Sequence, residues 1–162
     1  MKRINVSIVC ADPGEYPGCT DLLDVYPEIK VIARAESLAD DEIRHAMNES
    51  NVLVVDDCVL RQDGLETLAS IHGGFPWVNI LLVHEKYIYN NVIEYLVLGV
   101  RGFVARKSIV SHLRRAIPAL YSGEVWIPRQ MVQSLRKRST NLPGNSSWEL
   151  SPSVIPGAEK IN

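Results

Sequence analysis

Acidic residues that directly follow apolar strands are the residues of this chain best suited to chemistry. Asp56 and Asp57 follow the run 52–55, which is too short for a helix and apolar on both faces. Such a run is typical of a central strand in a parallel sheet, and ligands collect at the carboxyl edge of these sheets. Asp12 follows an earlier apolar stretch, 4–11. Carboxylates that meet at this edge are hard oxygen ligands for a divalent cation.

The residues after the central strand predict how it connects to the next helix. Asp63 and Glu66 have the spacing of a capping box around a turn at Gly64, so a helix is expected to begin at Asp63. The strand, the acid, a seven-residue loop and the capped helix then form one unit. Because side chains alternate along a strand, Asp57 is expected to point away from Asp56.

Short apolar runs alternate with helical patterns along the chain. The expected strands are 4–11, 29–33, 52–55, 78–84 and 102–105, and the expected helices are 20–25, 40–49, 63–72, 86–98 and 108–121. Because crossovers in such repeats are right-handed, we expect an α/β fold, a flavodoxin-like (βα)5 doubly wound parallel sheet of order 2-1-3-4-5. Strand one then lies beside strand three, and Asp12 meets Asp56.

Composition indicates one globular domain and a tail. With 162 residues, 46% hydrophobic and 22% charged, the chain is long enough to bury a full core. A net charge of −2 argues against a protein that coats nucleic acid by charge alone. No apolar run approaches a membrane span, and no signal peptide is apparent, so we expect no membrane association and a cytoplasmic location. Three cysteines without metal spacing indicate reduced structural thiols.

The acidic strand end and the Asp-Gly turn seven residues later resemble a known family. They are similar to the phosphoacceptor strand and following loop of two-component response-regulator receiver domains, and the resemblance covers about 4–121. Residues 119–128, ALYSGEVWIP, resemble the linker of the LuxR-type (NarL-like) branch. The resemblance implies a receiver domain at 1–121, a linker and short helix at 122–138, and a flexible tail at 139–162 that is a possible vestige of a DNA-binding domain.

Compared with the family, this chain keeps the phosphoacceptor aspartate but has different residues at several other positions of the pocket. The resemblance implies that Asp56 accepts a phosphoryl group and that Asp12, Asp56 and Cys58 hold the metal. Arg106 stands where the family has lysine, and His84 stands where it has threonine or serine. One of the two acids that end strand one is replaced by Ala11, so Mg²⁺ is expected to bind weakly or not at all. The proline four residues after the acceptor is replaced by Leu60.

Two functions are compatible with this pattern. The first is an atypical receiver in signal transduction and transcription regulation, switched by phosphorylation of Asp56 by a sensor histidine kinase or other signalling protein. The second is a phosphorylation-independent pseudo-receiver that dimerises, acts as a scaffold or binds a small ligand. Neither is an enzyme beyond self-phosphorylation at Asp56 from a phosphodonor. A flavodoxin-like enzyme is disfavoured, because no glycine-rich loop follows strand one and no nucleophile elbow is present.

The resemblance also implies how the chain would associate with a second copy and with DNA. A homodimer is expected through helix 4, strand 5 and helix 5, which Pro118 is expected to bend at its last turn. DNA binding is expected only if a missing C-terminal domain exists. An Asp56 that is closed off from solvent, or that lies far from Asp12, would count against phosphorylation.

Overall fold

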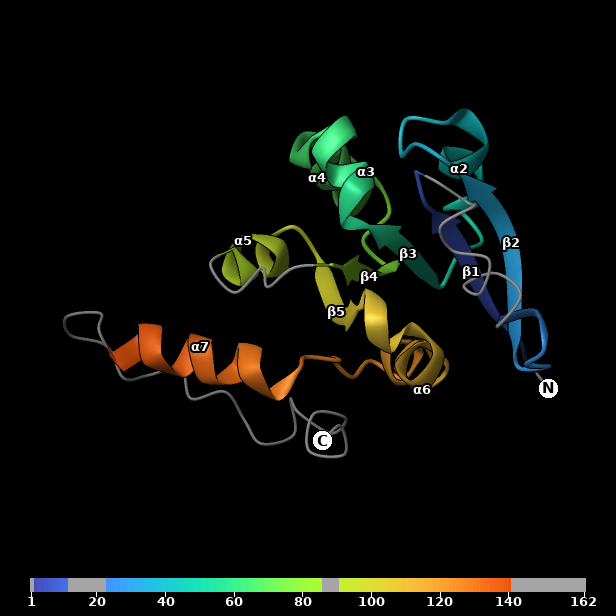
Figure 1. The fold of residues 1–162 in the computed structure, drawn as a ribbon. Coiled ribbons are helices and arrows are strands. Elements are labelled where there is room, and N and C mark those ends of the chain that lie inside the picture. The colour runs from blue at the N-terminus through green and yellow to red at the C-terminus, as the bar shows by residue number, and fades with distance from the viewer. Residues whose placement is uncertain (1, 12–22, 86–90, 141–162) are drawn as a thin grey trace.

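A five-stranded parallel sheet forms the centre of the computed structural model, which describes residues 2–11, 23–85 and 91–140 (Figure 1). The sheet has the order β2-β1-β3-β4-β5, as the alternation of apolar runs predicted. Its strands are β1 (Ile4–Val9), β2 (Ile29–Ala35), β3 (Val52–Asp56), β4 (Asn79–His84) and β5 (Val100–Ala105). The flavodoxin-like fold expected from the sequence is therefore confirmed. Of the helix expected at 20–25, residues 20–22 lie outside the described residues.

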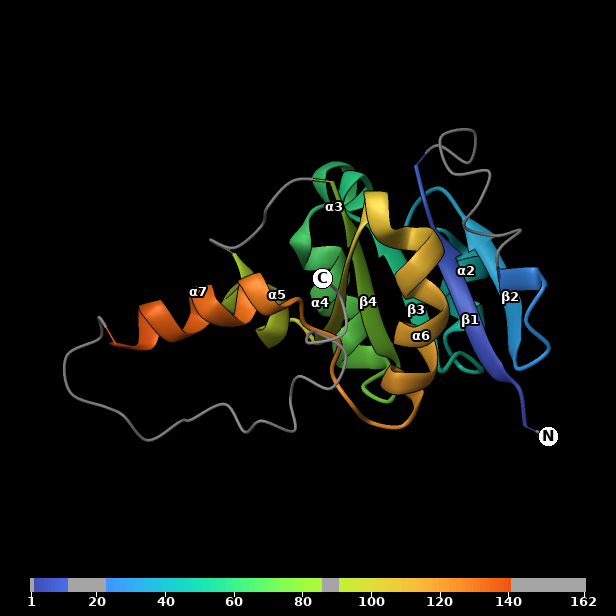
Figure 2. The ribbon, with the colours of Figure 1, turned by 60° about the horizontal axis from the view of Figure 1, so that its bottom comes forward.

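Helices cover both faces of the sheet. They are α2 (Asp41–Ala46), α3 (Asp57–Asp63), α4 (Leu65–Gly74), α5 (Val92–Val97), the short 3₁₀ helix η1 (Arg106–Ser108), α6 (Ile109–Tyr121) and α7 (Arg129–Thr140). Figure 2 shows α6 lying across the face of the sheet that is turned away from α2, α3 and α4. Two buried apolar clusters result, one on each face of the sheet.

The two central strands explain why both faces are apolar. All five residues of β3 and five of the six residues of β4 are buried. Alternate residues belong to different clusters: Leu53 and Val55 face the α2–α5 side, whereas Val52 and Val54 face α6. Because water reaches neither face, an apolar residue is favoured at every position, which is the continuous run seen in the sequence.

The connection after β3 differs from the expected loop. Residues 57–63 form the helix α3, and Asp56 is its N-cap, because its carboxylate accepts a hydrogen bond from the Cys58 N–H at 2.8 Å. The segment contains neither proline nor glycine, and Val59 and Leu60 bury their side chains against the core. With leucine at the position of the family's proline, nothing prevents a helix from starting directly at the strand end.

The predicted capping box at Asp63 is also wrong. Asp63 ends α3, and its carboxylate accepts hydrogen bonds from the Leu38 N–H at 2.7 Å and from the Ser37 hydroxyl at 3.0 Å. The N-cap of α4 is Gly64, which adopts φ +83° and offers no side chain. Asp63 therefore ties α3 to the loop that follows β2, a long-range role that local spacing does not reveal.

Helix α6 agrees with the predicted helix five in position. Ile109, Leu113 and Ile117 are buried, whereas Val110 is 70% exposed. Ser108 occupies the N-cap position without a side-chain hydrogen bond. The helix continues past Pro118 to Tyr121.

The segment after α6 belongs to the same core. Trp126 pairs with Gly102 of β5: its N–H donates to the Arg101 carbonyl at 2.9 Å, and its carbonyl accepts from the Phe103 N–H at 2.8 Å. The segment therefore protects the outer edge of β5 as a short extra strand would. Ile127 and residues of α7 then join the cluster on the α2–α5 side; the α7 residues are Met131, Val132 and Leu135.

A glycine ends helix α5. Gly99 follows α5 at φ +94°, a conformation that suits a C′ glycine, and a side chain there would collide with the ring of His72. Over 2–11, 23–85 and 91–140, no helix has the length and apolar character needed to cross a membrane. The predicted tail falls outside the described residues from residue 141 onward.

Candidate functional site

The candidate site is the carboxyl end of β3, where Asp56 meets a cation from a distant part of the chain. Asp56 is 3% exposed. Arg106 directly follows β5, and its Nη2 lies 2.9 Å from Oδ1 and 3.1 Å from Oδ2 of Asp56. Because β4 lies between β3 and β5, the long arginine side chain has to cross the end of β4 to reach this carboxylate. Arg106, which stands where the family has lysine, thus lies against the carboxylate of Asp56.

Arg106 also pairs with two further carboxylates. Its Nη2 lies 3.5 Å from Oδ1 of Asp57, and its Nη1 lies 3.3 Å from Oε2 of Glu85. The Arg106 side chain is 20% exposed. One guanidinium therefore neutralises part of a cluster of three acids, which is how a bound cation would act at this edge.

Asp57 was expected to point away from Asp56, and this prediction is wrong. Because Asp57 is the first residue of α3 rather than part of the strand, strand alternation does not apply to it. Its Oδ1 lies 3.7 Å from Nη2 of Arg61, and its Oδ2 accepts a hydrogen bond from the Glu85 N–H at 3.3 Å. Asp57 therefore belongs to the site, although strand periodicity predicted the opposite. The signal in the sequence that could have indicated this was the pair of consecutive acidic residues, Asp56 and Asp57.

Cys58 joins the site with its thiol next to two guanidinium groups. Arg106 Nη2 lies 3.3 Å and Arg61 Nη2 lies 3.1 Å from its Sγ. Burial raises the pKa of the Cys58 thiol to about 11, and the neighbouring Asp56 adds to this rise. The thiol is therefore protonated at neutral pH and is a poor metal ligand.

The described residues do not suit Mg²⁺ well. One ligand atom from each of Asp56, Asp57 and Cys58 lies within 4.8 Å of the others. However, Arg106 already forms ion pairs with the carboxylates of Asp56 and Asp57. Mg²⁺ also prefers oxygen ligands to a protonated thiol. Asp12, the other predicted metal ligand, lies outside the described residues. Strands β1 and β3 are neighbours, as its expected meeting with Asp56 requires, but that meeting stays a prediction.

Electrostatics at Asp56 are dominated by burial. Burial raises the pKa of the Asp56 carboxyl from 3.8 to about 6, and hydrogen bonds from Cys58 oppose this rise. The ion pair with Arg106 also favours the charged form. The structure thus places an acid in surroundings that penalise its charge and supplies one cation that compensates for it.

His84 lies at the end of β4 and is 5% exposed. Asp56 is in register with Val83, and both line a small cavity on the α6 side of the sheet. Because side chains alternate along β4, His84 points to the opposite side of the sheet from Val83. His84 is therefore one strand away from Asp56, but its side chain does not line the same cavity.

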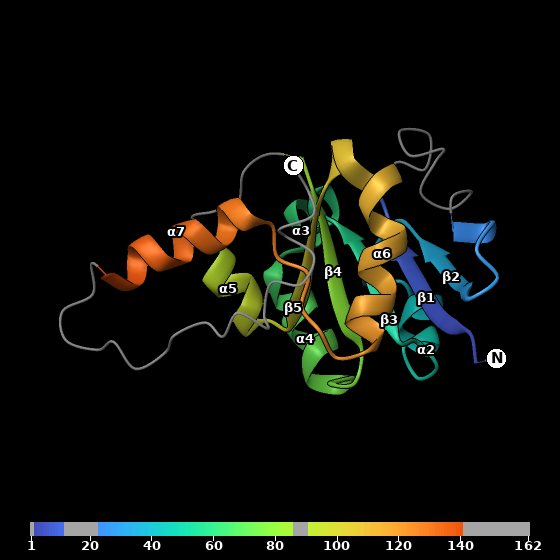
Figure 3. The same cartoon turned by 90° about the horizontal axis from the view of Figure 1, so that it is seen from below.

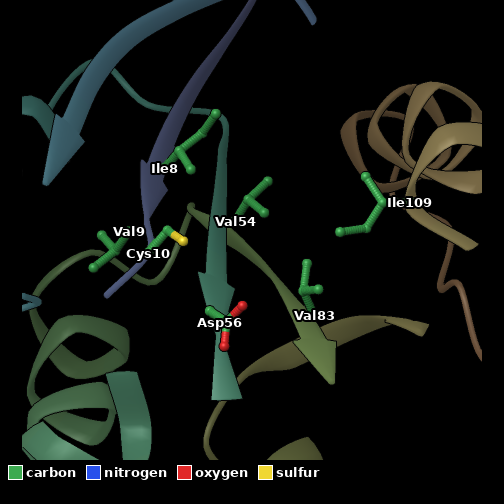
Figure 4. A pocket seen from close by; sticks show the side chains of 7 residues that line it. All are labelled: Ile8, Val9, Cys10, Val54, Asp56, Val83 and Ile109. Carbon is green, nitrogen blue, oxygen red and sulfur yellow. The ribbon is translucent and has the colours of Figure 1, made fainter. Parts of the chain in front are cut away.

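The cavity next to Asp56 is mainly apolar. Figure 4 shows Asp56 at the end of β3 with Cys10, the residue after β1, beside it, and apolar side chains surround the pair. The other lining residues are Ile8, Val9, Val54, Val83 and Ile109. This lining explains the cost of charging Asp56, because apolar side chains offer no hydrogen bonds to a carboxylate.

Comparisons with solved structures agree on the fold. RcsB of Salmonella typhimurium, a response regulator, superposes with a TM-score of 0.73 at 21% identity, over 93% of this chain and 73% of that chain. A LuxR-family two-component response regulator from Aurantimonas sp. has a TM-score of 0.74 at 18% identity, over 86% of this chain and all of that chain.

The isolated REC domain of RcsB from Salmonella enterica serovar Typhimurium has a TM-score of 0.72 at 20% identity, over 83% of this chain and 99% of that chain. No protein-family model and no curated protein matches the sequence. The fold of this chain is therefore that of response-regulator receiver domains, and its structural neighbours include LuxR-family regulators. The resemblance seen in the sequence is confirmed at the level of fold.

Proposed function

We propose that this chain is a signalling module with a receiver fold that works without phosphorylation of Asp56. The observation that carries the proposal is the position of Arg106, whose guanidinium lies against both oxygens of a carboxylate that is 3% exposed. In this state the acceptor oxygens are neither open to a phosphodonor nor free to bind a divalent cation. Arg106 supplies the positive charge that the metal would otherwise supply.

The role of such a module is to present a protein surface. Helix α5 exposes two apolar side chains one turn apart: Ile93 is 39% exposed and Val97 is 73% exposed. The edge of β5 is already paired with Trp126. We therefore place the proposed homodimer contact on α5 and α6, with the β5 edge excluded from it. A signalling partner other than a kinase would use the same surface.

Phosphorylation of Asp56 is the second candidate. It is favoured by the position of Asp56 at the carboxyl end of the central strand, with a guanidinium at hydrogen-bond distance. For this reaction Arg106 would have to move from the carboxylate to the phosphoryl oxygens. The two candidates differ in what they predict for the unmodified protein with Mg²⁺.

Intact mass and melting temperature separate them. The protein is incubated with Mg²⁺ and acetyl phosphate, alongside Asp56→Asn, Arg106→Ala and Lys107→Ala. Under the main proposal, wild type gains no phosphoryl mass and Mg²⁺ leaves its melting temperature unchanged. Arg106→Ala becomes stabilised by Mg²⁺, because Asp56 and Asp57 lose their internal cation. Lys107→Ala, which removes the adjacent exposed charge, behaves like wild type. A phosphoryl adduct on wild type that is missing in Asp56→Asn would overturn the proposal.

A further inference from the structure

The charge of this chain is strongly segregated along the sequence. Residues 101–140 hold nine of the 17 lysines and arginines but only one, Glu124, of the 19 aspartates and glutamates. A net charge of −2 therefore conceals a basic C-terminal region and an acidic remainder. Charge asymmetry of this kind is typical of proteins that contact nucleic acids or other polyanions.

The fold places these charges on consecutive helices. Six basic side chains are exposed in the part of this region whose burial the structure describes, and we call them the basic surface: Lys107, Arg114, Arg115, Arg129, Arg136 and Lys137. They come from η1, α6 and α7; α6 packs on one face of the sheet, whereas the buried residues of α7 join the cluster on the α2–α5 side. Figures 1 and 3 show α7 to the left of β5 and α6 to its right. Among the described residues, no carboxylate lies within ion-pair distance of Lys107, Arg114, Arg115 or Arg129.

The basic surface is held in place by packing. The Arg114 guanidinium lies 4.5 Å from the ring centroid of Tyr26, and that of Arg115 lies 5.8 Å from the ring centroid of Trp126. Cation–π contacts of this kind orient the guanidinium planes without cancelling their charge. Trp126 comes three residues before Arg129, so it connects the α6 part of the surface to the start of α7.

Burial fixes the rotation of α7. Met131, Val132 and Leu135 lie in the core, so Arg129, Arg136 and Lys137 face outward. The stripe from residue 129 to 137 is about 12 Å long at 1.5 Å per residue. Over that length a DNA duplex presents about seven phosphates, counting both strands. A small anion would reach only one or two of these cations, whereas a polymer of phosphates reaches all of them.

We propose that the basic surface binds the phosphate backbone of double-stranded nucleic acid without reading its sequence. This function does not depend on whether Asp56 is phosphorylated. Charge alone would drive the contact, and the acidic remainder of the chain would orient the protein with α6 and α7 toward the duplex. With about four phosphate contacts, affinity should fall roughly 100-fold between 50 and 200 mM salt.

The experiment measures binding of the full chain to a fluorescent mixed-sequence DNA duplex at several salt concentrations. The α7 variant Arg129→Gln, Arg136→Gln, Lys137→Gln should bind at least tenfold more weakly at 50 mM salt, with a shallower salt dependence. A matched control removes three exposed charges elsewhere, as Lys2→Gln, Lys30→Gln, Arg44→Gln, and should lose less than threefold. Melting curves of all variants confirm folding, and Lys107→Gln with Arg114→Gln repeats the test on η1 and α6.

Three results would overturn the proposal. One is no binding of wild type to the duplex at 50 mM salt. Another is an equal loss of affinity in the α7 variant and the matched control, which would indicate an effect of net charge alone. The third is binding to a poly-glutamate peptide but not to the duplex, which would assign the basic surface to an acidic protein.

Discussion

Asp56 combines burial with an ion pair, and these two influences act on its charge in opposite directions. Its apolar neighbours penalise the carboxylate, and Arg106 stabilises it. At this scale the site resembles a structural ion pair more than an open phosphorylation pocket. Removing one partner of such a pair is costly, because the other is left buried and uncompensated.

The raised pKa of Asp56 predicts a pH dependence of stability. A carboxyl whose pKa is 3.8 when unfolded and about 6 when folded is protonated more readily in the folded state. Stability should therefore increase as the pH falls from 7 to 5, by about 1 kcal/mol relative to Asp56→Asn. Urea unfolding of both proteins at the two pH values measures this difference. A wild type that loses stability relative to Asp56→Asn over this range would show that Arg106 outweighs burial.

Gly99 permits a conformation and a contact that other residues would disturb. It adopts φ +94°, and a β-carbon there would meet the His72 ring. Gly99→Ala should therefore destabilise the protein by more than about 1 kcal/mol. The control is Gly73→Ala in α4, where a β-carbon meets nothing within 4 Å and helix propensity favours alanine by up to about 1 kcal/mol. Thermal melts of the two variants should shift in opposite directions.

At the scale of elements, two segments take roles that differ from simple connections. Residues 57–63 form α3 directly at the end of β3, which places Asp57 and Cys58 beside Arg106. After α6, Trp126 completes the edge of the sheet and α7 buries apolar residues in the core. The short helix that family resemblance assigns to a linker is thus packed against the receiver fold.

Packing of α7 predicts a measurable contribution to stability. Met131 is 0% exposed within the core, so Met131→Ala should lower the free energy of unfolding by about 2–5 kcal/mol. Gln133, which is exposed on the same helix, is the control, and Gln133→Ala should change it by no more than about 0.5 kcal/mol. Chemical denaturation compares the two. Equal, small effects would mean that α7 detaches from the domain in solution.

For the whole molecule, the proposed dimer uses the exposed apolar side chains of α5 and excludes the covered edge of β5. Val97→Glu should weaken the proposed dimer, because a charge at the centre of an apolar contact must be desolvated without a partner. Val25→Glu is the matched control, since Val25 is 69% exposed and Val97 is 73% exposed. Light scattering over a concentration series reports the oligomer. Identical masses for both variants would remove α5 from the interface.

The sequence by itself determined the strands, their order, and the position of Asp56 at the end of the central one. These follow from apolar runs and from the handedness of βα crossovers, which are local or general properties. The end of α5 has a local signal of the same kind, because glycine readily adopts the left-handed conformation that follows a helix. The meeting of Asp12 with Asp56 and the residue boundaries of the tail stay predictions.

Only the tertiary structure decided what surrounds Asp56. Its ion pair with Arg106 joins residues 50 positions apart, and Asp57 belongs to the site only because a helix starts one residue after the strand ends. The outward rotation of α7 likewise depends on contacts with α5 and the core. Such features arise from how elements pack, and neither hydrophobic period nor motif spacing carries that information.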